Sequence, residues 1–259
     1  MTIDASWLAS HLDDENLIII DSRGIMPFRF SHIKNAVPMG VEKVISTDEN
    51  GAHMVITPQA AEETFTDVGI DDTKVVIVYG EYPDPSLARI VWTLIYFGHR
   101  NVKILDIGFE NWLQSGYPVT KDFRSNNTAT KPDRGFIAHI KATERADAQI
   151  IFEEKDKPKT IIIDARTPQE HLYARIPGSI LHNYDEGIGD KGKMIKDVEV
   201  LKKDFERIGI TQDKQIICYC HSGIRAAHTY LQLKQAGFAN VRLYDGSIID
   251  WAKRKYPLG

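Results

Sequence analysis

Short apolar runs alternate with longer amphipathic stretches along this chain, and the alternation occurs twice. The first half contains an apolar run, a stretch with helical spacing and a second apolar run: Val75–Tyr79, Leu87–Phe97 and Val102–Leu105. The second half repeats this order in Gln215–Tyr219, Ala226–Ala236 and Val241–Tyr244. Short continuous apolar runs are typical of buried strands, and apolar residues three or four apart are typical of helices. The strand–helix–strand order predicts βαβ units around a parallel sheet, so we expect an α/β fold.

The two halves are copies of one unit. Leu17–Arg23 reads Leu-Ile-Ile-Ile-Asp-Ser-Arg, and Thr160–Arg166 reads Thr-Ile-Ile-Ile-Asp-Ala-Arg roughly 140 positions later. Further matches follow in the same order: Gly69 and Gly209, Ile70 and Ile210, Lys74 and Lys214, Tyr79 and Tyr219, Gly98 and Gly237, Asn101 and Asn240, Val102 and Val241, Asp106 and Asp245, Trp112 and Trp251, Tyr117 and Tyr256, Pro118 and Pro257. This series predicts two domains of similar fold.

The stretch between the copies is polar and has no hydrophobic period. Its centre, Arg124–Pro132, reads Arg-Ser-Asn-Asn-Thr-Ala-Thr-Lys-Pro, a composition typical of a linker. We therefore predict one domain over residues 1–120, a linker over 121–134 and a second domain over 135–259.

Composition and charge narrow the function classes. The formal net charge of -4, from 32 basic and 36 acidic residues, offers no broad cationic surface, so we expect neither nucleic acid nor a membrane as a partner. No segment approaches the ~18 apolar residues that cross a bilayer, and the first residues lack the pattern of a signal peptide. These features predict a cytoplasmic protein.

The chain contains only two cysteines, Cys218 and Cys220. With one residue between them they cannot join distant parts of the chain, and two thiols alone do not make a zinc site. We expect no metal, nucleotide or organic cofactor. Cys218 alternates with Tyr219 inside an apolar run, which favours a buried structural thiol over a partner that resolves a disulfide with Cys220.

Cys220 begins the loop Cys-His-Ser-Gly-Ile-Arg, which joins a predicted strand to a predicted helix. In an open parallel sheet, such a turn lies at the carboxyl edge, where functional sites gather. Successive backbone N–H groups and the dipole of the helix that follows form a cradle for an anion, and they favour a thiolate over a thiol. The loop therefore predicts a nucleophilic cysteine, with His221 and Arg225 adding donors or charge.

The Cys-led six-residue loop after an apolar strand, the Asp-x-Arg strand endings and the segment Asp245–Trp251 together resemble the tandem-domain rhodaneses. The resemblance covers nearly the whole chain. It implies two rhodanese-like α/β domains, each with a central parallel sheet flanked by helices on both faces. In that family the second domain usually bears the cysteine, and here the matching loop of the first copy, Gly80–Ser86, has none. The first domain is therefore expected to be inactive, with a structural or regulatory role.

The resemblance also implies double displacement. The Cys220 thiolate takes a sulfur atom from thiosulfate or 3-mercaptopyruvate, and a second nucleophile removes it from the resulting persulfide. The expected partners are a small anionic sulfur donor and an acceptor such as cyanide, a thiol or a thioredoxin-like protein, and we expect a monomer. The residues expected to bind the donor are His221, Ser222, Gly223, Ile224, Arg225 and Arg166.

The basic residues near the loop have competing interpretations. A cation at a helix start is unfavourable against the dipole, so Arg225 suggests a bound anion that compensates it. Arg166 matches the family's substrate-contacting arginine, yet Arg23 occupies the same place in the cysteine-free copy, which equally favours a structural ion pair. Arg175 departs from the family's usual motif and is either a second cation at the site or a surface residue.

The loop leaves the donor open. Ser222 and Gly223 are shared with mercaptopyruvate-type loops of the family, whereas His221 and Arg225 favour thiosulfate, because a compact dianion gains more from added positive charge. We expect thiosulfate.

Two other functions compete with sulfur transfer. A rhodanese-like phosphatase or arsenate reductase would need a Cys-x5-Arg loop wide enough for a phosphoryl group, and the spacing here is Cys-x4-Arg. A persulfide carrier or redox-sensing module without turnover is the non-enzymatic alternative.

Overall fold

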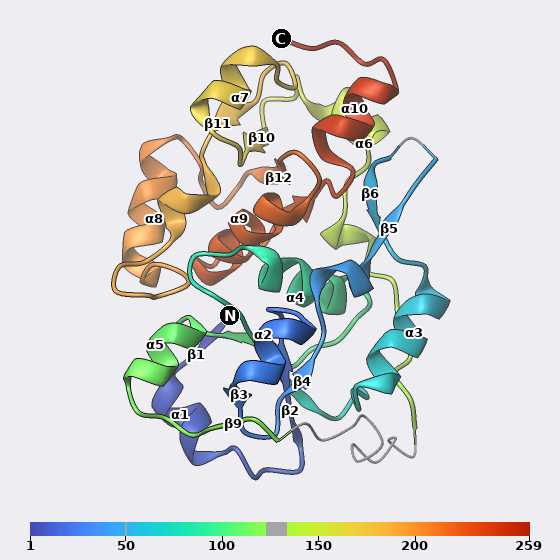
Figure 1. Cartoon of the computed structure of the whole chain (residues 1–259). Coiled ribbons are helices and arrows are strands. Elements are labelled where there is room, and N and C mark those ends of the chain that lie inside the picture. Colours follow the sequence, from blue (N-terminus) through green and yellow to red (C-terminus); the bar gives the residue numbers. More distant parts are fainter. Residues whose placement is uncertain (50, 123–133) are drawn as a thin grey trace. The chain divides into compact units, whose positions relative to one another are not determined.

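The chain folds into two compact units, described here from a computed structural model (Figure 1). The structure describes residues 1–49, 51–122 and 134–259, so most of the predicted linker over 121–134 lies outside the described residues. The first unit comprises 1–45, 56–140 and 190–194, and the second comprises 46–55, 141–189 and 195–259. Each unit therefore includes one short segment from the other half of the sequence.

The first unit is built on a five-stranded parallel sheet with strand order β1-β8-β7-β2-β4. Its strands are β1 Thr2–Ile3, β2 Leu17–Asp21, β4 Val37–Pro38, β7 Val75–Tyr79 and β8 Val102–Leu105. A small antiparallel pair consists of β3 His32–Ile33 and β9 Val119–Thr120. The helices are α1 Ala5–Ser10, α2 Ile25–Phe30, α3 Pro58–Asp67, α4 Ser86–Tyr96 and α5 Phe109–Gln114, with the 3-10 turn η1 Val41–Val44.

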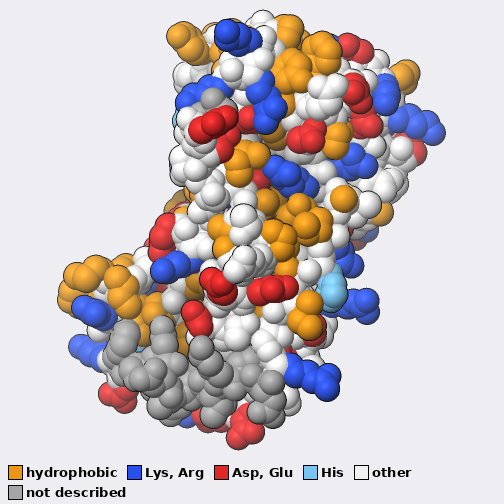
Figure 2. All heavy atoms as spheres, turned by 90° about the vertical axis from the view of Figure 1, so that its right-hand side faces the viewer, with side chains coloured by type: hydrophobic (Ala, Val, Ile, Leu, Met, Phe, Trp, Pro, Cys, Tyr) orange, Lys and Arg blue, Asp and Glu red, His pale blue; other side chains and the backbone are white. Residues whose placement is uncertain are grey.

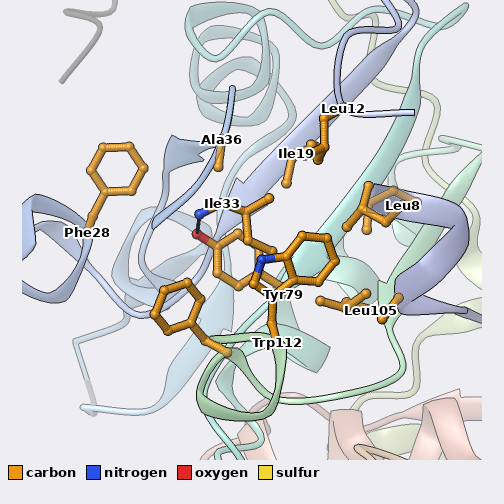
Figure 3. Close-up of a cluster of buried hydrophobic side chains, with 12 residues drawn as sticks. Leu8, Leu12, Ile19, Phe28, Ile33, Ala36, Tyr79, Leu105 and Trp112 are labelled. Carbon is orange, nitrogen blue, oxygen red and sulfur yellow. Dashed lines mark hydrogen bonds between the residues drawn. The ribbon is translucent and has the colours of Figure 1, made fainter. Parts of the chain in front are cut away.

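Both faces of this sheet are covered by helices. Side chains alternate along a strand, so Ile77 and Tyr79 of β7 point to one face, where they join the hydrophobic cluster of Leu8 from α1 and Trp112 from α5 (Figure 3). The intervening residues of β7 point to the other face, where α4 packs against β7 and β8. Within the first cluster, the Ile33 backbone N–H donates to the Tyr79 hydroxyl at 3.1 Å.

The second unit has a four-stranded parallel sheet with strand order β11-β10-β12-β13. Its strands are β10 Thr160–Asp164, β11 Ile180–Leu181, β12 Gln215–Tyr219 and β13 Val241–Leu243, and its helices are α6 Ala148–Glu154, α7 Pro168–Tyr173, α8 Val198–Arg207, α9 Ile224–Gln235 and α10 Ser247–Lys253. The 3-10 turns are η2 Ala142–Glu144 and η3 Tyr184–Gly187, and β5 Ile45–Thr47 pairs with β6 His53–Val55 in a separate ribbon. The predicted α/β architecture is confirmed in both units.

Matched residues of the two copies form the same hydrogen bonds in their units. Tyr79 and Tyr219 each accept a backbone N–H bond at 3.1 Å, from Ile33 and from Ile176 respectively. The matched tryptophans each donate a ring N–H bond to a carbonyl six residues later. The predicted helix over Ala226–Ala236 begins earlier, at Ile224, because the turn that precedes it closes within four residues, 220–223.

The surface agrees with the balanced charge of the chain. Acidic and basic side chains are interspersed on the face shown in Figure 2. Within the described ranges, no helix is both long enough and apolar enough to cross a membrane.

Candidate active site

The cysteine loop lies where the sequence predicts it, between a strand and a helix. Strand β12 ends at Tyr219, Cys220 follows directly, and α9 begins at Ile224. Gly223 precedes the helix with φ of 85°, in the left-handed region. A residue with a Cβ atom would be strained there by about 1–2 kcal/mol, so glycine is the residue that allows this tight turn.

Three hydrogen bonds hold Cys220 in place. Its backbone N–H donates to the Ser247 hydroxyl oxygen at 3.0 Å, and its carbonyl accepts from the Ile248 N–H at 3.1 Å. Its Sγ atom accepts the backbone N–H of Gly223 at 3.1 Å, and the residue is 1% exposed. A fixed backbone N–H directed at sulfur stabilises negative charge on it, in the thiolate and in any sulfur adduct.

Ser247 is a site residue that the sequence interpretation missed. It is buried, it has φ of 54°, and its hydroxyl donates to the Tyr244 carbonyl at 2.8 Å while it accepts from Cys220. The hydroxyl oxygen lies 4.0 Å from Cys220 Sγ. Its counterpart in the cysteine-free copy is Gly108, so a position-by-position comparison of the two copies was the signal that could have identified it.

Arg225 forms an ion pair in the folded protein. Its two terminal nitrogens donate to the two carboxylate oxygens of Glu170 on α7 at 2.7 and 2.8 Å. The hydrogen bonds from Arg225 lower the pKa of Glu170 to about 2. The anion that compensates this cation at a helix start is therefore a side chain of the same unit, and the sequence interpretation did not include Glu170.

Arg166 is part of a buried cluster at the end of β10. It donates to both carboxylate oxygens of Asp164 at 2.9 and 2.7 Å and to the carbonyl of Ala174 at 2.6 Å. The same carboxylate accepts the Tyr219 hydroxyl at 2.8 Å and lies 2.9 Å from His171 Nδ1. Burial opposes ionisation of Asp164, but the hydrogen bonds from Arg166 and His171 outweigh it and lower its pKa.

The cysteine-free copy contains the same ion pair. Arg23 donates to Asp21 at 3.0 and 2.7 Å and to the carbonyl of Ser31 at 2.7 Å, and Tyr79 donates to Asp21. Because this geometry is kept where no cysteine is present, the arrangement of Arg166 is that of a structural ion pair. Direct contact of Arg166 with a donor stays a prediction.

The remaining predicted residues fall at different depths. His221 is exposed, whereas Ser222 and Ile224 are half-buried. Cys218 is fully buried, and burial raises the pKa of its thiol, which agrees with a structural role. Arg175 exchanges two backbone hydrogen bonds with Gly259, at 3.2 and 2.9 Å.

In the described part of the chain, no group of three or more His, Cys, Asp or Glu side chains could hold a metal ion. The hydrogen bonds around Cys220 support nucleophilic attack by a cysteine held among backbone donors.

Comparison with known proteins decides the family. The model of the rhodanese-like domain matches residues 4–115 and again residues 147–254, which together are most of the chain. The chain is a tandem rhodanese-like protein. The resemblance to the tandem-domain rhodaneses, noted from the cysteine loop, the Asp-x-Arg strand endings and the segment Asp245–Trp251, is thereby confirmed.

Rhodanese-like relatives align along nearly the whole chain. The 3-mercaptopyruvate sulfurtransferase of Escherichia coli is 29% identical, with 97% of this chain and 95% of that protein covered. The sulfur carrier protein TtuD of Thermus thermophilus is 25% identical, with 96% and 92% covered. The thiosulfate/3-mercaptopyruvate sulfurtransferase 2 of Arabidopsis thaliana is 27% identical, with 96% and 83% covered.

Solved structures agree with this fold. The rhodanese-fold crystal structure of SseA from Escherichia coli has a TM-score of 0.84 at 27% identity, covering 95% of this chain and 98% of that one. An anaerobic ergothioneine biosynthesis enzyme from Chlorobium limicola has a TM-score of 0.86 at 18% identity, covering 99% of this chain and 69% of that one. At that identity the second likeness concerns the fold alone.

The cysteine-free rhodanese-like copy keeps the scaffold of the loop. Gly80 takes the place of Cys220, and its carbonyl accepts the Phe109 N–H at 2.9 Å. A Cβ atom added at Gly80 would lie 2.6 Å from the Ser22 hydroxyl oxygen. The residue that matches Ser22 in the other copy is Ala165, which has no such oxygen. The first copy therefore lacks the thiol, and a side chain at Gly80 would have to displace the Ser22 hydroxyl.

Proposed function

We propose that this chain is a sulfurtransferase that carries sulfur as a persulfide on Cys220. The observation that carries the proposal is the placement of Cys220 Sγ against the Gly223 N–H at the start of α9, because a persulfide anion needs fixed donors of this kind. The relatives support the same class of reaction, since they are named as sulfurtransferases and as a sulfur carrier.

The proposed reaction has two displacement steps. With thiosulfate, the Cys220 thiolate attacks the outer sulfur, the S–S bond of the donor breaks, and sulfite leaves with the electron pair. With 3-mercaptopyruvate, the C–S bond breaks instead, and the thiol proton of the donor ends on the methyl group of pyruvate. Cyanide then attacks the terminal sulfur of the persulfide, which forms thiocyanate and restores the thiolate.

The donor is a small anion, thiosulfate or 3-mercaptopyruvate. The expectation of thiosulfate depended in part on the charge of Arg225, and Glu170 offsets that charge in the folded protein. The acceptors that suit a persulfide are cyanide, a small thiol or a thioredoxin-like protein. We further propose that the cysteine-free copy is non-catalytic and that the protein works as a monomer in the cytoplasm.

A steady-state assay of thiocyanate formation from thiosulfate and cyanide, run in parallel with pyruvate release from 3-mercaptopyruvate, tests the function. We expect many turnovers per protein with at least one donor, and their loss in Cys220→Ser. Retained turnover in Cys220→Ser would refute the role of this cysteine. Turnover of an aryl phosphate comparable to that of the sulfur donors would instead favour a phosphatase.

The second candidate function is a persulfide carrier without turnover. The relative named as a sulfur carrier protein, 25% identical to this chain, supports this candidate. Mass spectrometry separates the two. A single sulfur atom loaded on Cys220 in stoichiometric amount, with no turnover on addition of cyanide or thiols, would identify a carrier.

A further inference from the structure

The ion pair of Glu170 and Arg225 joins α7 to the first turn of α9, the helix that follows the Cys220 loop, and neither the function nor the scaffold accounts for it. Arg225 is the second residue of α9 and lies five positions after Cys220. The pKa of Arg225 is raised, first by its hydrogen bonds to Glu170 and further by the charge of Cys220. The Arg225 side chain is 23% exposed and the Glu170 side chain 33%, so the pair is partly shielded from solvent.

Glu170 is fixed from two directions. It occupies the third position of α7, where it forms a capping box with Thr167: its carboxylate accepts the Thr167 N–H at 3.1 Å, and the Thr167 hydroxyl accepts the Glu170 N–H at 3.3 Å. The carboxylate also accepts the Thr167 hydroxyl at 3.0 Å and the two bonds from Arg225. A carboxylate held in this way keeps Arg225 in one orientation and, with a pKa of about 2, stays ionised throughout the pH range of enzyme assays.

The two copies of the fold show that this pair is not part of the common scaffold. The buried pair of Asp164 and Arg166 recurs as Asp21 and Arg23. By contrast, Pro27 takes the position of Glu170 in the cysteine-free copy, and the loop Gly80–Ser86 that matches Cys220–Arg225 contains no arginine. Both partners are therefore absent where the thiol is absent, which links the pair to the chemistry of the loop.

The net charge at the start of α9 matters because the two candidate donors differ by one unit of charge. Thiosulfate is a dianion, and 3-mercaptopyruvate with its thiol protonated is a monoanion. A lone guanidinium would attract the thiosulfate dianion more strongly than the 3-mercaptopyruvate monoanion. The carboxylate paired with Arg225 removes most of this difference in attraction.

We propose that Glu170 is a positioning residue that neutralises Arg225 and thereby sets the donor selectivity of the site, in favour of the less charged donor. The inference rests on the proposed sulfurtransferase function. The preference for one donor over the other then depends on the Glu170–Arg225 pair and not on Arg225 alone.

The test is the ratio of kcat/KM for thiosulfate to kcat/KM for 3-mercaptopyruvate. We expect Glu170→Gln to raise this ratio by about tenfold, because Arg225 then presents its charge uncompensated. Arg225→Gln should lower the ratio by a similar factor, because it leaves the carboxylate alone. The double variant should return close to the wild-type ratio. Glu199→Gln is the matched control, since Glu199 is exposed on α8 and pairs only at the surface with Lys202.

A purely structural role predicts a different pattern. It would lower kcat/KM for both donors by the same factor and leave the ratio unchanged in every variant, and that result would overturn the inference. Raised salt provides a second readout, because it should reduce the shifted ratio of Glu170→Gln toward the wild-type value. If the wild-type protein turned over neither donor, the proposed function itself would fail, whereas wild-type turnover with unchanged ratios refutes only the role of Glu170.

Discussion

The substitution Asp164→Asn isolates the buried ion pair at the end of β10. The change keeps the size of the side chain and an oxygen for the Arg166 backbone N–H, but it removes the negative charge. The Arg166 side chain is 5% exposed, and its guanidinium would lose the acceptor of one hydrogen bond, face a neutral amide oxygen in the second and keep the third, to the Ala174 carbonyl. The Tyr219 hydroxyl would lose its anionic acceptor as well.

The expected cost follows from the burial of the cation that is left behind. Removing one partner of a buried ion pair typically costs about 3–5 kcal/mol, because the remaining charge is uncompensated. Native domains are stable by only about 5–15 kcal/mol, so the loss should remove a large part of the stability of the second unit. The matched variant Asp21→Asn should impose a comparable loss on the first unit, where the Arg23 side chain is 7% exposed.

Hydrogen–deuterium exchange assigns each loss to its unit. The free energy of opening should fall in β10 and β12 for Asp164→Asn, and in β2 and β7 for Asp21→Asn. A change below ~1 kcal/mol at pH 7 in the second unit would refute the view that the pair stabilises the fold. Equal changes in all four strands with either variant would refute the assignment to separate units.

The pH dependence gives this prediction a second test. The pKa of Asp164 is lower in the folded state, so its ionised form contributes stability above the unfolded value of about 4, and that contribution is lost as the pH falls further. The gap between wild type and Asp164→Asn should therefore be full at pH 7 and narrow below about pH 4. A gap that does not change with pH would indicate that the charge is not its source.

Three further variants test the loop. Gly223→Ala should lower turnover by roughly tenfold through left-handed strain of about 1–2 kcal/mol, measured as kcat with the preferred donor, and unchanged kcat would contradict the strained turn. Ser247→Ala should cost about 1–3 kcal/mol, because the buried Cys220 N–H loses its acceptor; a urea titration that matches the wild-type curve would refute this role. Cys218→Ala should retain turnover and destabilise the fold by about 1 kcal/mol, whereas loss of turnover without unfolding would assign Cys218 a chemical role.

Much of the fold could be predicted from local pattern. The apolar run Gln215–Tyr219 matches strand β12 residue for residue, because a buried parallel strand requires continuous apolar side chains. The repeat predicted equivalent sheets, and the parallel pairings β2·β7 and β10·β12 confirm it. The segments 46–55 and 190–194 belong to units other than those of their flanking sequence, and no periodicity records such contacts.

The site could be predicted only in part. A strand, a cysteine and a glycine in succession define the turn, and the structure has that turn. Glu170 is 55 positions from Arg225, and Ser247 is 27 positions from Cys220, so these partners meet only when the sheet brings the ends of its strands together. The anion that the sequence led us to expect at Arg225 was an external one, and the fold supplies an internal one.

The sequence by itself determined the repeat, the sheet class and the place of Cys220 between a strand and a helix, because each depends on residues close together in the chain. Only the tertiary structure decided which charges remain available around that cysteine. Arg166 and Arg225 are both cations in the sequence, yet each faces a carboxylate across a hydrogen bond in the folded chain. Because each arginine is neutralised by a carboxylate that is close in space, the net charge that a sulfur donor meets depends on how the chain packs.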